Sequence, residues 1–139
     1  MSARYLLDTD ALSEPIRPRP ERRFMMKMER HASSLAISSV TWHEANFGVQ
    51  RLPAGRRRQE LERYLRDVIE VCIPVLPYDR AAAAWHAAER ARLEGAGHTP
   101  PFADGQNAAI AVTRGLTLVT RNLADYSPFE GVAVEDWCR

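Results

Sequence analysis

Short apolar runs alternate with longer helical patterns along the chain, and this alternation constrains the fold more than any other feature of the sequence. The runs fall at residues 4–7, 35–40, 72–76, 116–120 and 132–134. Such alternation is typical of a mostly parallel β-sheet with helices on both faces. We therefore predict an α/β fold with five strands, in which ligands would bind at the carboxyl ends of the strands.

The segments between these runs carry apolar residues at helical spacing. The predicted helices span residues 11–14 and 21–31, 41–51, 56–71, 79–94 and 102–114. The stretch PIRPRP interrupts the first of them, because proline cannot sit inside a helix. Pro74 indicates that the third strand lies at an edge of the sheet, since proline donates no hydrogen bond to a neighbouring strand.

The length of 139 residues fits one compact domain, residues 1–139. The formal charge of +1 gives no overall bias towards nucleic acid. The N-terminal region has no long apolar run, so we expect no signal peptide, no membrane helix and a cytoplasmic location. Cys72 and Cys138 show neither metal-ligand nor framework spacing, which favours reduced thiols but leaves one disulfide open.

Two carboxylates one residue apart, Asp8 and Asp10, end the first apolar run. Burying a carboxylate is unfavourable, so this pair either caps the next helix or holds a cation. Asp10 is well placed to cap that helix, whereas Asp8 lies two residues too early. We expect Asp8 to belong to a site and leave both roles open for Asp10.

Three further acids, Glu44, Asp104 and Asp125, lie near strand ends or helix starts. Each has a structural alternative. Glu44 could complete a capping box with Thr41. Asp104 could complement a helix dipole, and Asp125 could be a turn residue. Taken together with Asp8, however, they would repel one another at a single rim unless a cation sat among them. Hard divalent cations such as Mg²⁺ take oxygen ligands of this kind.

Four stretches of the sequence resemble the PIN-domain ribonucleases, specifically the VapC-type toxins of bacterial toxin–antitoxin pairs. They are YLLDTDALSE, SSVTWHEANFGV, TPPFADGQNAAIAVTRGLTLVTRNLADY and GVAVEDW, in the family's order across nearly the whole chain. The resemblance implies strand order 3-2-1-4-5 and a metal-dependent endoribonuclease that acts as a toxin. It also implies an RNA substrate such as tRNA, a cognate antitoxin and a homodimer.

The resemblance also implies a site in which Asp8, Glu44, Asp104 and Asp125 bind Mg²⁺ or Mn²⁺. Thr9 and Thr120 match small hydroxyl positions that support this site. There are two departures from the family pattern. Asp10 stands where many relatives have asparagine, and Asn122 stands where others place their fourth acid. Either Asp125 or Asn122 therefore fills the fourth position.

Other functions remain open at this point. A housekeeping PIN nuclease or a non-catalytic RNA-binding PIN module would share the same fold. A haloacid-dehalogenase-like phosphatase also begins with a strand and Asp-x-Asp, but it needs a later lysine near the active rim. Lys27 is the only lysine and lies too early. A receiver domain lacks support for the same reason.

Two surfaces could bind partners. The arginines at positions 51, 56, 57, 58, 63 and 66 could form an RNA backbone track or a solvated face paired with Glu60 and Glu62. An antitoxin segment could lie between the helices at 11–31 and 41–51. Apolar residues there would line its groove or belong to the core; they are Phe24, Met25, Met28 and Phe47.

Overall fold

A central five-stranded sheet organises the computed structural model, which describes residues 2–139. The strands are β1 (Tyr5–Leu7), β2 (Leu35–Ser38), β3 (Val75–Leu76), β4 (Thr117–Val119) and β5 (Val134–Glu135). Their order is β3-β2-β1-β4-β5, and every strand pair is parallel. The predicted α/β fold and strand order are confirmed, and the third strand lies at an edge, as Pro74 indicated.

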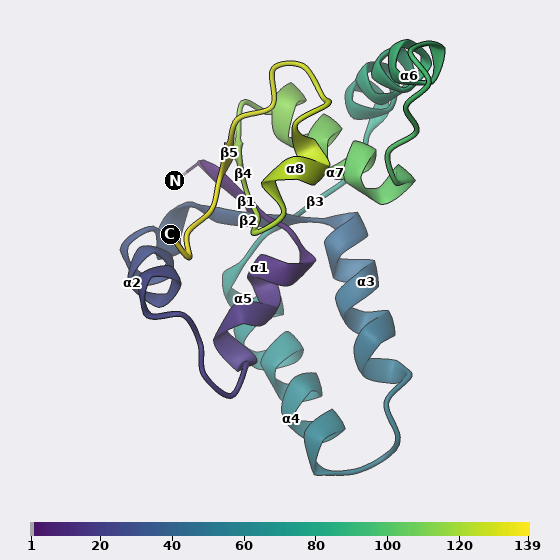
Figure 1. Ribbon diagram of the computed structural model, residues 1–139. Helices are drawn as coiled ribbons and strands as arrows, with labels where there is room; N and C mark the ends of the chain where they lie inside the picture. Colours follow the sequence, from purple (N-terminus) through teal and green to yellow (C-terminus); the bar gives the residue numbers. More distant parts are fainter. Residues whose placement is uncertain (1) are drawn as a thin grey trace.

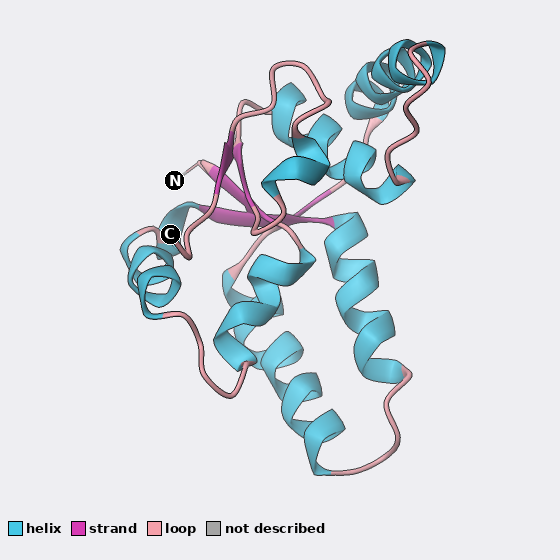
Figure 2. Ribbon diagram, in the orientation of Figure 1, coloured by secondary structure: helices cyan, strands magenta, loops and turns pink. Residues whose placement is uncertain are grey.

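Helices cover both faces of the sheet (Figures 1 and 2). They are α1 (Thr9–Ser13), α2 (Arg22–Arg30), α3 (Ser39–Gln50), α4 (Arg56–Arg63), α5 (Glu70–Cys72), α6 (Arg80–Gly95), α7 (Phe102–Thr113) and α8 (Leu123–Tyr126). Tyr5 and Leu7 of β1 pack into the core beneath α1, α3 and α4, whereas Leu6 packs into the core beneath α6 and α7. Successive strand side chains point to opposite faces, so a continuously apolar strand needs both layers.

Several predicted boundaries are wrong by a few residues. The run at 35–40 ends as a strand at Ser38, because the Ser38 hydroxyl accepts a hydrogen bond from the Thr41 amide at 2.9 Å and starts α3. The capping box between Thr41 and Glu44, which was the structural alternative for Glu44, is therefore not formed. The run at 72–76 contributes only Val75–Leu76 to the sheet, and the last strand lies at Val134–Glu135 rather than at 132–134.

The third predicted helix, residues 56–71, forms one continuous but irregular helical rod. It passes from α4 through a π-helical stretch, Tyr64–Ile69, into α5. The first helix is interrupted as expected, because a 3-10 turn at Glu14–Ile16 carries the chain out of α1 before the proline-rich loop. The short helix α8 was not predicted, and it carries Asp125.

Cys72 and Cys138 are free thiols, which is the first of the two states that the sequence left open. Across residues 2–139, we find no helix with both the length and the hydrophobicity needed to cross a bilayer.

Candidate metal centre

Asp8 lies directly after β1 and is buried. Its Oδ1 accepts a hydrogen bond from the Ala11 amide at 2.9 Å, so Asp8 is the N-cap of α1. Of the two roles left open for Asp10, capping is therefore not the one it has. The prediction that Asp8 lies too early to cap is wrong, because α1 begins two residues earlier than the apolar pattern suggested. Burial raises the pKa of Asp8 to about 6. Hydrogen bonds from Thr120 and Ala11 lower that pKa in part, and the negative charges of Asp10 and Glu44 raise it further.

Asp104 stands in the first turn of α7. Burial raises its pKa to about 6, and the negative charges of Asp125, Asp8 and Glu44 add to the rise. The Tyr126 hydroxyl opposes it by hydrogen bonding. The negative charge of each of the three other predicted site acids therefore acts on Asp104, although the four acids come from four different segments of the chain.

All of these acids line one hollow of about 220 Å³. Its lining residues are Asp8, Thr9, Asp10, Glu44, Asp104, Asn107, Asn122, Asp125 and Tyr126. The carboxyl ends of parallel strands meet at one edge of the sheet, which explains why distant acids gather there. Of the predicted site residues, only Thr120 is outside this lining; it is buried beside Asp8.

The carboxylates surround the hollow without forming a closed cage. Within residues 2–139, no three acidic, histidine or cysteine side chains converge closely enough to hold a metal as they stand. The expectation that Asp8, Glu44 and Asp104 meet around a cation-sized gap is therefore not met in that tight form. One reason is that the like charges of the carboxylates repel one another. In addition, the Thr9 hydroxyl donates a hydrogen bond to Glu44 Oε1 at 3.3 Å and so restrains that carboxylate.

Both candidates for the fourth acidic position, Asp125 and Asn122, line the hollow. Asp125 lines the hollow from α8, and its charge raises the pKa of Asp104. Asn122 donates from Nδ2 to Asp10 Oδ2 at 2.7 Å, and its backbone amide donates to Thr120 Oγ1 at 3.0 Å. Asn122 thus engages the extra acid Asp10, while Asp125 faces the other carboxylates.

Two contacts outside the hollow hold the segments that carry its acids. Gly105 follows Asp104, and a Cβ atom there would lie 2.1 Å from Nε2 of the buried His86, so only glycine fits. The buried Glu14 forms ion pairs with Arg121 at 3.1 Å and with Arg17 at 3.3 Å. The first pair anchors the turn that precedes Asn122.

Sequence reasoning missed two residues of the hollow, Asn107 and Tyr126. Asn107 is three residues after Asp104, so it lies on nearly the same face of α7. Tyr126 directly follows Asp125. A polar residue one turn after a candidate ligand was the available signal, but the surrounding apolar residues made α7 read as a packing helix.

The donor set suits a hard divalent cation. The lining residues supply carboxylate, amide and hydroxyl oxygens, and none of them is basic. Ligands of this type are those that Mg²⁺ and Mn²⁺ prefer. The raised pKa values of Asp8 and Asp104 reflect both burial and negative charge that nothing in the lining neutralises.

Comparison with known proteins places the chain in a family. Residues 5–125 match the PIN domain family. The chain is 32% identical to VapC ribonuclease Y4jK of Sinorhizobium fredii, over 94% of this chain and 93% of that protein. It is 30% identical to the tRNA(fMet)-specific endonuclease VapC of Salmonella typhimurium, over 97% and 98%.

Solved structures with the same fold support this family assignment. A structure of FitAB bound to a DNA fragment has a chain with 29% identity and a TM-score of 0.88, covering 97% of this chain and 96% of that one. The DNA-bound VapBC complex from Salmonella typhimurium has a chain with 27% identity and a TM-score of 0.83, covering 98% of this chain and 99% of that one.

This fold and this acidic site define a PIN-domain protein. Within that class, the chain belongs to the VapC family of ribonuclease toxins from toxin–antitoxin systems, which removes the phosphatase and receiver alternatives.

Proposed function

We propose that this toxin hydrolyses RNA phosphodiester bonds with the help of Mg²⁺ or Mn²⁺, held by Asp8, Glu44, Asp104 and Asp125. The observation that supports this most directly is the single hollow that these carboxylates share without a basic neighbour. When bound, such a cation activates water and stabilises the negative charge that develops on the phosphate. By resemblance, the products would carry 5′-phosphate and 3′-hydroxyl ends.

The chain's own residues would prepare the site. Asp8 is fixed in place by the Ala11 amide, and Glu44 is oriented by the Thr9 hydroxyl. Asn122 engages Asp10 and so keeps that extra acid to one side. Asp125 is the better candidate for the fourth ligand, because its charge reaches Asp104.

Cleavage assays on purified protein test this proposal. We expect RNA cleavage with Mg²⁺ or Mn²⁺ and none with EDTA. The relative from Salmonella typhimurium is named as specific for tRNA(fMet), so initiator tRNA is the first substrate to try. Asp125→Asn should lower activity more than Asn122→Ala. If the protein binds RNA but never cleaves it with any divalent metal, a non-catalytic RNA-binding module is the better description.

We further propose a cognate antitoxin that occupies an apolar groove beside the acidic hollow. This groove, about 410 Å³, lies between α1, α3 and the rod of α4. Thr9 and Glu44 line both the groove and the hollow, so the two are continuous. An amphipathic antitoxin segment could bury its apolar face here. An arginine from it could reach the carboxylates, which guanidinium groups bind bidentately.

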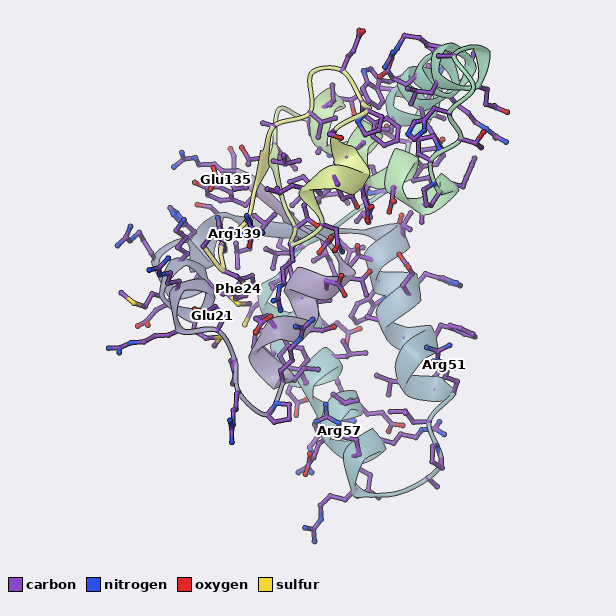
Figure 3. The ribbon with its side chains drawn as sticks, in the orientation of Figure 1. Glu21, Phe24, Arg51, Arg57, Glu135 and Arg139 are labelled. Atoms are coloured by element: carbon purple, nitrogen blue, oxygen red, sulfur yellow. The ribbon has the colours of Figure 1, made fainter. Side chains whose placement is uncertain are left out.

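The expected lining of this groove is only partly correct. Phe47 contributes to it, but Phe24, Met25 and Met28 do not. Phe24 is buried and packs on Trp137, with ring centroids 5.8 Å apart. Figure 3 shows Phe24 on α2, well away from Arg51 at the end of α3. Phe24 and Met28 therefore serve the core, whereas Met25 is exposed.

Gly48 offers a selective test of the antitoxin site. It lines the groove, and a Cβ atom there would have no neighbour within 4 Å. Gly48→Phe should therefore fold and fill the groove, and whatever toxicity it keeps should escape neutralisation by the product of the neighbouring gene. Growth arrest that co-expression relieves for the wild type but not for this variant would support the proposal. Relief of both proteins alike would contradict it.

Ion pairs along the arginine-rich helix α4 favour a solvated face over a continuous RNA backbone track. Arg57 pairs with Glu60 at 3.9 Å, and Arg58 pairs with Glu62 at 2.7 Å. Arg57 lies at the start of α4, away from the sheet (Figure 3). We assign RNA contact instead to α3, where Arg51 lies over the exposed ring of Phe47, 5.3 Å from its centroid. Aromatic rings with arginine neighbours stack well on unpaired bases.

Two further expectations belong to the proposed toxin. A homodimer is implied by the resemblance, and the exposed ring of Phe102 is a candidate contact; sedimentation of wild type against Phe102→Ser would test it. A toxin that acts on RNA would work in the cytoplasm.

A further inference from the structure

Asn107 is an unusual residue for its position. It begins a buried run on α7, and the next four residues, Ala108 to Ala111, are fully buried. Asn107 itself is 3% exposed. A buried amide is unfavourable unless its polar atoms find partners, so its partners should reveal why it stands there.

The main partner of Asn107 is Ser38, at the end of β2. The Ser38 hydroxyl donates to Asn107 Oδ1 in a short hydrogen bond. The same hydroxyl oxygen accepts from the Thr41 amide and so caps α3. Because a serine hydroxyl has only one proton, this arrangement fixes the carbonyl of Asn107 towards Ser38. One hydroxyl therefore joins the first turn of α3 to α7.

The other end of the Asn107 amide faces the hollow. Asn107 lines it together with Asp104 and Tyr126. Burial raises the pKa of Tyr126, and a hydrogen bond with Asn107 offsets part of that rise. Burial likewise raises the pKa of Asp104, and a hydrogen bond with Tyr126 offsets part of that rise. Polar side chains thus connect the cap of α3 with the carboxylate of Asp104.

We propose that Asn107 is a positioning residue that fixes α3, which carries Glu44, relative to α7, which carries Asp104, so that both carboxylates can bind one cation. This inference rests on the proposed function. The two acids come from distant segments, and in the absence of a cation their charges repel. The buried contact between Ser38 and Asn107 holds their two helices together against that repulsion.

Metal affinity, rather than activity, tests the inference. We would measure Mn²⁺ binding by electron paramagnetic resonance in the wild type, Asn107→Leu, Ser38→Ala and the double variant. Leucine has a similar size and suits a buried site. Each single variant should weaken Mn²⁺ binding by roughly fivefold or more, and the double variant should be no weaker than the poorer single one, because both break the same link.

A matched control separates positioning from general loss of stability. Asp79 caps α6 by accepting from the Ala82 amide at 3.0 Å, as Ser38 caps α3, but it is not among the residues lining the hollow. Asp79→Ala should lower the melting temperature as Ser38→Ala does, yet leave Mn²⁺ affinity unchanged. If Asn107→Leu does not fold, Ser38→Ala against Asp79→Ala decides the question.

The outcomes are distinct. Wild-type Mn²⁺ affinity in folded Asn107→Leu or in Ser38→Ala would overturn the inference. The inference would also be overturned if the losses of Mn²⁺ affinity in the two single variants multiplied in the double variant. Asn107 and Ser38 would then affect Mn²⁺ binding independently of their contact. Absence of Mn²⁺ binding by the wild type would instead refute the proposed function, and the inference with it.

Discussion

Asp8→Asn should stabilise the metal-free toxin, because Asp8 is held in a setting that disfavours its charge. Burial raises the pKa of this carboxyl from 3.8 to about 6. The folded protein therefore keeps a proton between about pH 4 and pH 6 that the unfolded chain releases. The free energy of unfolding falls as pH rises through this window and stays lower above it. The full effect corresponds to roughly 3 kcal/mol at neutral pH.

Asparagine would remove this penalty and keep the cap. Its carbonyl can still accept from the Ala11 amide, while one acceptor towards Thr120 is lost. After allowing about 1 kcal/mol for that bond, we expect a net gain of about 1–2 kcal/mol at pH 7.5. For a chain of this length, the gain corresponds to a rise in melting temperature of roughly 3–7 °C.

Thermal melts followed by circular dichroism in EDTA would measure this effect. The difference between Asp8→Asn and wild type should be present at pH 7.5 and nearly absent at pH 4, where Asp8 is protonated in the folded protein and still partly protonated in the unfolded chain. Asp67→Asn, which changes a carboxylate with 60% side-chain exposure, serves as the matched control and should show no gain. If Asp8→Asn is less stable than wild type at pH 7.5, or if the difference does not depend on pH, the reasoning is wrong.

Two other substitutions test the contacts that hold the site. Gly105→Ala should destabilise the protein by about 1–3 kcal/mol through overpacking against His86, and adding this change to a His86→Ala background should have little further effect in denaturant melts. Glu14→Gln should lower stability by about 1–3 kcal/mol because its ion pairs with Arg121 and Arg17 are both lost. A melt unchanged by Glu14→Gln at low salt would show that neither pair, the one with Arg121 included, stabilises the fold.

The sequence predicts the layers of this fold well, for a simple physical reason. Strands buried on both faces must be apolar throughout, so β1 and β4 stand out between helical patterns. The order of the strands came only through the resemblance, because periodicity carries no information on which strands are neighbours. The predicted start of a helix was wrong where several neighbouring residues carry hydroxyls that could each cap it. In SSVT, Ser38 rather than Thr41 starts α3.

The gathering of the acids at one rim was predictable, but the residues that support them were not. Asp8 was singled out because a carboxylate at the end of a buried strand is costly without a function, whereas Glu44 and Asp104 were singled out by their shared rim position and by the resemblance. Asn107 was missed because its partner, Ser38, is 69 residues away along the chain. The groove was partly misplaced because an apolar stripe such as that of α2 looks the same whether it faces the core or a partner.

The most direct test of the account is metal-dependent RNA cleavage by wild type and Asp104→Asn, with Glu60→Gln as a control on an exposed carboxylate. We predict cleavage by the wild type and by Glu60→Gln in Mg²⁺, none in EDTA, and none by Asp104→Asn despite an intact fold. Full Mg²⁺-dependent cleavage by Asp104→Asn, or wild-type cleavage that persists in EDTA, would contradict the assignment of the acidic hollow as the catalytic metal centre.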